Sequence, residues 1–96
     1  LELITLRVAG KRLGVEIGHV TEISTRLRPF PAPVTTPHIA GVLNLRGEVV
    51  TVLKLDVILG VERRRESAGQ PKYVLLRCGD ERAAVEVDDV EDVQEV

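Results

Sequence analysis

The side chains best suited to chemistry in this chain are carboxylates gathered near its C-terminal end. Residues 86–95 hold six of them, enough in number to surround a metal ion. They are Glu86, Asp88, Asp89, Glu91, Asp92 and Glu95. A calcium loop, however, needs oxygen ligands at fixed positions around a turn glycine. This tract contains no glycine and is interrupted by valines, so it predicts no metal site.

The other reactive residue types are too scattered to form a catalytic or zinc-binding set. His19 and His38 lie far apart in the sequence, and one cysteine cannot complete the ligands of a zinc ion with them. Neither Ser24 nor Cys78 lies in a motif that would activate it as a nucleophile. We therefore expect a protein that is not an enzyme and that needs no cofactor or metal.

Cys78 is the only cysteine, so no disulfide can form within the chain. A single cysteine without a disulfide partner is typical of proteins in a reducing cytoplasm. The apolar run over residues 73–78 predicts that the Cys78 thiol is buried and structural. No apolar run approaches the ~20 residues that cross a bilayer. We expect a cytoplasmic protein that does not insert into a membrane.

Composition favours one small β-rich domain that binds other proteins. The chain has 96 residues, of which 44% are hydrophobic, and Phe30 and Tyr73 are its only aromatic residues. Two aromatics give little surface for stacking on bases, and no concentrated basic patch marks a nucleic-acid footprint. Residues 1–79 carry 12 basic and 7 acidic side chains, whereas residues 80–96 carry 1 basic and 8 acidic. Such an asymmetry could orient a charged protein partner.

Hydrophobic alternation and turn residues predict a succession of short strands. Strands are expected over residues 1–8, 13–17, 39–45, 49–55, 73–78 and 82–87. Residues 19–23 predict either one helical turn or a bent strand. Residues 88–96 place valines at 90, 93 and 96, a spacing that predicts a helical turn followed by the start of a strand.

The connections between these strands also carry signals. Pro29, Pro31, Pro33 and Pro37 predict an ordered connection outside the sheets, since proline cannot donate a ladder hydrogen bond. Asp56 is expected to cap a short helical turn that stops at Gly60. The run over residues 49–53 is apolar on both alternating faces, which predicts cover on both sides. Residues 61–71, with three arginines at 63–65, predict a solvated loop.

Glu22 and Arg46 are charged residues in apolar surroundings. Arg46 adjoins the turn glycine Gly47 between two apolar strands, and Glu22 lies between Val20 and Ile23. A hidden guanidinium is costly without a partner, so one interpretation is an internal ion pair that fixes the strands. The other is a polar spot in an apolar docking surface, which would give a partner its orientation. The residues alone leave both open.

The order of motifs along nearly the whole chain resembles the CheW-like domain, the coupling module of bacterial chemotaxis. The most specific motif is Gly-Val-Leu-Asn-Leu-Arg-Gly over residues 41–47. Before it stand Val-Thr-Glu-Ile over residues 20–23 and the prolines of residues 29–37. After it come Val-Leu-Lys-Leu with a Leu-Gly stop within residues 52–60, and Val-Asp-Asp-Val over residues 87–90.

The resemblance implies an all-β fold of paired SH3-like β barrels and a non-catalytic scaffold. Members of the CheW-like family bridge the regulatory domain of a CheA-type histidine kinase and the cytoplasmic tips of chemoreceptors. Glu22 and Arg46 match a charged pair near the receptor-binding surface of the family, with Val20 beside them. Asn44 belongs to the same motif, and Gly41 and Gly47 are expected to serve its turn geometry.

The resemblance also predicts one departure from the family. Residues 1–96 are expected to be a single domain that lacks the usual C-terminal strands, so that the second barrel is incomplete. We expect sub-barrel one over about 15–60 and sub-barrel two over about 61–96, with a contribution of residues 1–14 to the second left open. Open strand edges predict self-association. Two alternative functions remain: a CheW-like regulatory module within a larger signalling protein, and a small β-barrel enzyme or ligand-binding domain.

Overall fold

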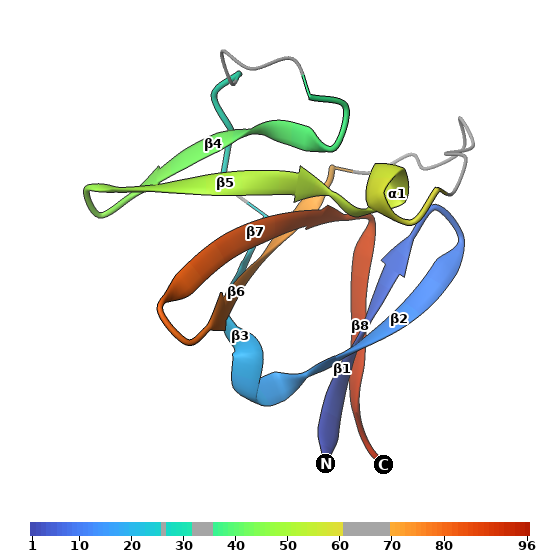
Figure 1. Ribbon diagram of the computed structural model, residues 1–96. Helices are drawn as coiled ribbons and strands as arrows, with labels where there is room; N and C mark the ends of the chain where they lie inside the picture. The colour runs from blue at the N-terminus through green and yellow to red at the C-terminus, as the bar shows by residue number, and fades with distance from the viewer. Residues whose placement is uncertain (26, 32–35, 61–69) are drawn as a thin grey trace.

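The computed structural model describes residues 1–25, 27–31, 36–60 and 70–96, and over these residues the chain is almost entirely β (Figure 1). The strands are β1 Glu2–Val8, β2 Lys11–Glu16, β3 Val20–Ser24, β4 Ile39–Leu45, β5 Glu48–Lys54, β6 Lys72–Cys78, β7 Glu81–Val87 and β8 Asp89–Glu95. Two short helices, η1 Ile17–His19 and α1 Leu55–Ile58, lie between them. Pro33 and the arginines at 63–65 fall outside the described residues.

The strands form two sheets. One has three strands in the order β2-β1-β8, and the other has five in the order β3-β6-β7-β5-β4. The sheets themselves have no boundary at residue 60, and the expected bounds of the two sub-barrels stay a prediction. Strands β6 and β7 join β4 and β5 in one sheet, because β7 pairs in parallel with β5. The three-stranded sheet combines β1 and β2 with β8, which are the first two strands and the last strand described.

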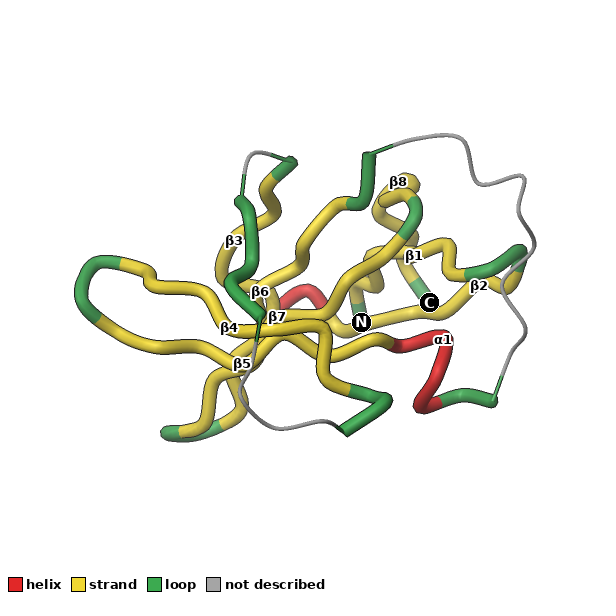
Figure 2. The backbone as a smooth tube through the Cα atoms, turned by 90° about the horizontal axis from the view of Figure 1, so that it is seen from above, coloured by secondary structure: helices red, strands yellow, loops and turns green. Residues whose placement is uncertain are grey.

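The proline-containing connection returns from one edge of the five-stranded sheet to the other. It leaves edge strand β3 and forms a bridge at Phe30 with Val42 of the opposite edge strand β4. Both backbone hydrogen bonds of this bridge, Phe30 N to Val42 O and Val42 N to Phe30 O, measure 2.8 Å. Figure 2 shows the segment crossing between the two edges. One short piece of chain thus connects the two edges of the sheet.

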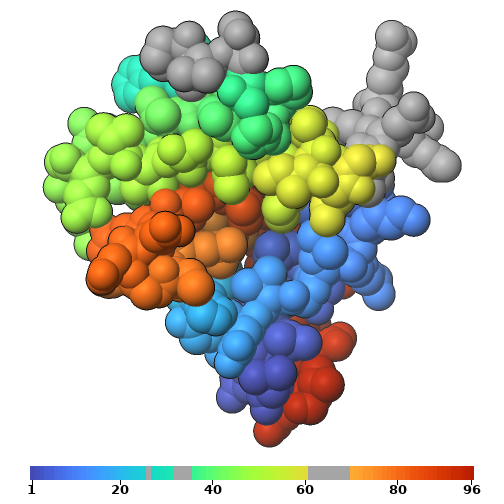
Figure 3. Space-filling view, in the orientation of Figure 1, coloured from blue at the N-terminus to red at the C-terminus, as the bar shows by residue number. Residues whose placement is uncertain are grey.

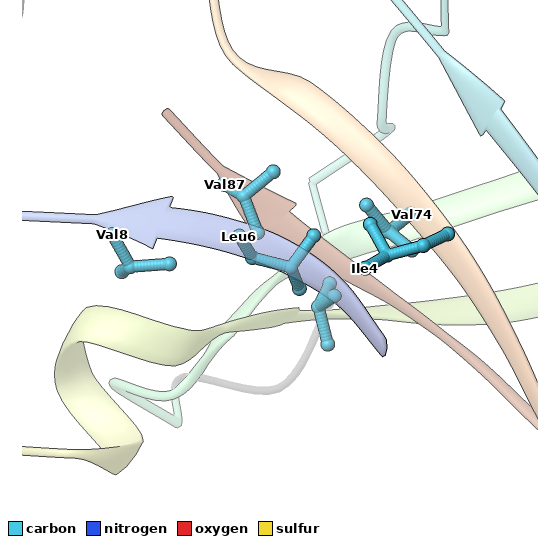
Figure 4. Packing of buried hydrophobic residues seen from close by; sticks show 6 residues of the cluster. Ile4, Leu6, Val8, Val74 and Val87 are labelled. Atoms are coloured by element: carbon cyan, nitrogen blue, oxygen red, sulfur yellow. The ribbon is translucent and has the colours of Figure 1, made fainter. Parts of the chain in front are cut away.

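The main core lies between the two sheets. Strand β1 contributes Ile4, Leu6 and Val8, which alternate towards the five-stranded sheet as its period of two requires. They meet side chains of β6 and β7, among them Val74 and Val87 (Figure 4). A second cluster lies within the five-stranded sheet and includes Leu43, Val50, Val52, Tyr73, Leu75 and Ala84. Apolar burial in the first cluster therefore holds the two sheets together, and the second cluster stabilises the five-stranded sheet itself.

The chain passes from one sheet to the other at Asp88. Its carboxylate Oδ2 accepts a hydrogen bond of 2.7 Å from Ala9 N, in the turn between β1 and β2. Its own backbone N–H donates to Arg7 O at 2.9 Å. The residue between β7 and β8 is thereby fixed to the β1–β2 hairpin.

Several details differ from the sequence-based expectations. Asp56 does not cap α1 but lies buried within its first turn, and Lys54 takes the capping position. Cys78 is exposed rather than buried, because it ends β6 beside the β6–β7 turn. Val49 is 74% exposed, so β5 is not covered on both sides along its whole length. Residues 89–95 form a strand without a preceding helical turn.

Ion pairs tie β8 to its neighbours. Glu91 Oε1 lies 2.6 Å from Arg7 Nη2 on β1 and 3.4 Å from Arg12 Nε on β2. Asp89 binds the ammonium group of Lys72 on β6. Part of the acidic C-terminal tract is thus matched by basic groups within the chain.

We expect stability to fall on acidification through the titration of Asp89. The pKa of Asp89 lies below its usual value, chiefly because the Lys72 side chain donates a hydrogen bond to its carboxylate. A second hydrogen bond, from Val90 N–H, lowers this pKa further. A carboxylate with a lowered folded-state pKa stabilises the fold fully above its unfolded pKa of about 4 and loses this contribution as the pH falls through the folded pKa. Asp89→Asn should therefore flatten the acid limb of the free energy of unfolding, measured by urea denaturation at a series of pH values. An unchanged acid limb would contradict the assignment.

Candidate functional site

The β4–β5 turn presents Arg46 to solvent on a rigid hairpin. Leu45 pairs with Glu48, which leaves Arg46 and Gly47 as a two-residue loop. Both have positive φ, 52° and 86°, as a type I′ turn requires of its two central residues. The side-chain oxygen of Asn44 accepts a hydrogen bond of 3.2 Å from Gly47 N. Asn44 and Gly47 thus fix the turn, and Arg46 is exposed at its tip.

Val20 and Glu22 lie on β3, where they have different roles. Val20 is half-buried and packs against the core between the sheets. Glu22 is exposed. The pairing of β3 with β6 shifts register between them, with Val20 opposite Leu76 and Glu22 opposite Leu75. This irregularity confirms the bent-strand alternative and turns Glu22 outwards while Val20 stays in the core.

The structure does not bring Glu22 and Arg46 together in an ion pair among the residues it describes. Their strands β3 and β4 are the two edges of the five-stranded sheet, with β6, β7 and β5 between them. Each side chain reaches the surface from a different edge. Their roles in binding a partner stay predictions.

Gly41 is required by close packing. A Cβ atom at this position would overlap the Phe30 carbonyl oxygen and would lie 3.1 Å from both the Phe30 carbonyl carbon and Pro29 Cβ. The glycine therefore allows the proline-containing connection to lie directly on β4. The expected structural role of Gly41 has a physical basis, although its function is backbone approach rather than a turn.

A surface hollow that the sequence did not indicate lies beside the β4–β5 hairpin. It measures about 450 Å³ and is lined by Glu48, Val49, Val50, Arg77, Asp80 and Arg82. Two of these lining residues, Glu48 at the start of β5 and Arg82 near the start of β7, form an ion pair. The pair depends on the parallel contact of β5 with β7, which links residues far apart in the sequence. No local pattern could have predicted it.

Neither a metal-binding cluster nor a membrane-spanning helix is found in the described parts of the chain. Within them, no group of three or more His, Cys, Asp and Glu side chains could hold a metal ion. None of the helices described is long and apolar enough to span a bilayer. Burial is the main cause that raises the pKa of Tyr73, and the negative charge of Glu86 raises it further. The phenol is therefore protonated near neutral pH.

Comparison with known proteins assigns this chain to a family. The sequence model of the CheW-like domain matches residues 2–96. The chain belongs to the CheW-like domain family. Within this CheW-like domain, the motif of residues 41–47 forms most of β4 and its turn, and that of residues 87–90 forms the passage between the two sheets at Asp88.

Two relatives agree with this assignment. The chain is 28% identical over 92 residues to the chemotaxis protein CheW of Bacillus subtilis (strain 168), covering 96% of this chain and 58% of that protein. The crystal structure of the scaffolding protein TtCheW from Thermoanaerobacter tengcongensis superposes with a TM-score of 0.89 at 23% identity. That match covers 99% of this chain and 64% of the other, and it shows the shared fold. The CheW-like domain described here thus spans about three fifths of each relative's length.

Proposed function

We propose that this CheW-like domain is a docking scaffold that couples chemoreceptors to a CheA-type histidine kinase. The observation that carries the proposal is the exposed Arg46 held in a positive-φ turn within the family motif. The fixed turn presents this guanidinium to a partner carboxylate without any further ordering of the backbone. The relatives, which include a chemotaxis protein and a scaffolding protein, support a coupling role over a regulatory module of a larger protein.

The receptor-facing surface is proposed to centre on Arg46 and Glu22. Both are exposed, and they carry opposite charges on opposite edges of one sheet. Two separated charges of opposite sign can set the direction in which a helical receptor tip lies across the sheet. Val20 supports β3 from the core, and Asn44 supports the turn that carries Arg46. The kinase regulatory domain is proposed to bind a different face.

The site can be tested with substitutions that spare the fold. Arg46→Asn removes the charge, and asparagine tolerates positive φ better than most side chains do. We expect this variant to capture a receptor-tip fragment at least about tenfold more weakly, since the lost charged contact leaves a partner carboxylate unpaired. Glu22→Gln should weaken receptor capture in the same direction. Pull-down and calorimetric titration with receptor and kinase fragments would measure both effects.

The controls separate binding from folding and one partner from the other. Arg28→Asn removes an exposed arginine from the proline-containing connection and should leave receptor capture unchanged. Binding of the kinase regulatory domain should survive Arg46→Asn. Undiminished receptor assembly with both Arg46→Asn and Glu22→Gln, in variants that keep the wild-type melting temperature, would refute the proposed site.

A further inference from the structure

The β4–β5 hairpin carries a carboxylate close to the exposed Arg46. Glu48 is the first residue of β5 and pairs with Leu45, so these two residues close the turn that Arg46 and Gly47 form. Two residues of chain span at most about 7 Å, a distance that an arginine side chain can bridge. Glu48 is also the only acidic residue of β4 and β5. It is therefore the internal group best placed to compete for the charge of Arg46.

In the structure this carboxylate is held by another strand. Arg82 of β7 donates a hydrogen bond from its Nη1 atom to Glu48 Oε2. The contact joins the β4–β5 hairpin to the region of the β6–β7 turn, and Figure 3 shows these two parts lying against each other, yellow-green against orange. Within the described part of the chain, Glu48 forms this ion pair and none with Arg46.

The pairing of β5 with β7 fixes this arrangement. The two strands run parallel with Val52 opposite Ala84, and both residues are buried in the second core cluster. Side chains alternate along a strand, so Glu48 belongs to the same face as Val52. By the same period Arg82 belongs to the face of Ala84. The side chains of Glu48 and Arg82 are 59% and 45% exposed, so the ion pair lies where this apolar face meets solvent.

A second arginine lies close by but is held elsewhere. Arg77 of β6 is opposite Arg82 of β7, and both line the hollow beside Glu48. Arg77 Nε donates a hydrogen bond of 3.1 Å to the carbonyl oxygen of Gly79, in the turn that follows its own strand. Arg82 is therefore the arginine that neutralises Glu48, and Arg77 offers a control with the same charge in the same hollow.

We propose that Arg82 is a positioning residue of the partner-binding site, which holds Glu48 and thereby keeps Arg46 available to a carboxylate of the partner. This role rests on the proposed function, in which Arg46 meets an acidic group of the receptor tip. Without Arg82, the Glu48 carboxylate can turn to Arg46, and the hollow beside it offers space for the movement. An exposed ion pair is weak, but a competitor in the same hairpin acts at a high effective concentration. The partner would then have to displace an internal ion pair in order to bind.

Calorimetric titration of the chain with a receptor-tip fragment tests this role. Arg82→Gln should raise the dissociation constant about three- to fivefold, because the released Glu48 competes for Arg46. Glu48→Gln removes the competitor and should leave the constant within about twofold of wild type. The double variant E48Q/R82Q should bind like wild type, although Arg82 is missing. A purely structural role of the ion pair predicts the opposite, since either single substitution breaks the pair and the double variant does not restore it.

A second readout needs no partner. Exchange of the Arg46 Nε–H proton with water, measured by NMR, should slow at least about twofold in Arg82→Gln, where Glu48 pairs with Arg46. The exchange should return to the wild-type rate in E48Q/R82Q. Arg77→Gln removes a positive charge from the same hollow and should change neither the exchange nor the binding. Circular dichroism on each variant would show that the fold persists.

The two readouts separate a failure of this role from a failure of the proposed function. If Arg46→Asn weakens receptor capture but Arg82→Gln does not, Arg82 has no positioning role and the proposal is overturned. A double variant that fails to recover, or an unchanged exchange rate of Arg46 in Arg82→Gln, would overturn it as well. If Arg46→Asn itself leaves capture unchanged, the proposed function fails and the positioning role fails with it.

Discussion

Gly41→Ala is expected to lower the free energy of unfolding by about 3 kcal/mol or more, since overpacking costs 1–3 kcal/mol and each lost hydrogen bond about 1. The added methyl group would overlap the Phe30 carbonyl oxygen, which accepts the 2.8 Å hydrogen bond from Val42 N. The same methyl group would also lie 3.1 Å from Pro29 Cβ, which is tighter than ordinary van der Waals contact. The bridge between the connection and β4 must therefore open. Urea denaturation followed by circular dichroism would measure the loss.

Gly18→Ala is the matched control for this change. A Cβ at Gly18 in η1 would meet no heavy atom within 4 Å. The same methyl group should therefore cost little there, less than about 1 kcal/mol, because surface changes away from special geometry have small effects. If Gly41→Ala cost no more than Gly18→Ala, the close approach of Phe30 would not be a constraint on the fold.

Leu6→Ala should destabilise the chain by about 2–5 kcal/mol, the range seen when a buried leucine is truncated. Leu6 has no exposed surface and packs between the sheets in the same cluster as Val74, Val85 and Val87 (Figure 4). The cavity would lie at the junction of the two sheets, in the cluster through which β1 packs against β6 and β7. Chemical denaturation would give the change in free energy directly.

The matched substitution is Leu59→Ala, which removes the same atoms from a side chain that is 43% exposed just after α1. It should cost about 1 kcal/mol or less, since much of this surface already contacts water. Equal losses at residues 6 and 59 would show that the cluster between the sheets does not dominate stability.

Local patterns in the sequence predicted the hairpins well. Residues 39–45 and 49–55 correspond to β4 and β5, and residues 73–78 and 82–87 to β6 and β7. Their turns depend on glycine and on alternation, which are properties of neighbouring residues. The family motif around Arg46 likewise marked an exposed turn whose geometry the structure explains.

The failed predictions have physical reasons that involve more distant residues. A register shift between β1 and β8 places Val90 opposite Leu6 and Val93 opposite Ile4, so both valines belong to the inner face although they are three residues apart. An irregularity of this type inserts one residue into a strand and thereby imitates the spacing of a helical turn. The valine spacing therefore predicts a helical turn where the chain forms a strand.

Sheet membership and the hollow at Glu48 could not be predicted for a related reason. Both depend on the parallel pairing of β5 with β7, and β6 lies between these strands in the chain. Parallel pairing needs a crossover connection, whose course no hydrophobic period encodes. Cys78 was wrongly expected in the interior because its apolar run ends in the solvent-exposed part of β6.

The central position of β1 has a consequence for how the molecule is assembled. Its two neighbours are β2, which follows after one turn, and β8, which is the last strand described. Until the ribosome has released residues 89–95, β1 can have only one of its two partners, and the apolar row of Ile4, Leu6 and Val8 lacks the flanking Val90. Strand β1 is therefore completed only after β8, which lies far along the sequence, has been synthesised, and until then the unfinished sheet must be kept from pairing elsewhere.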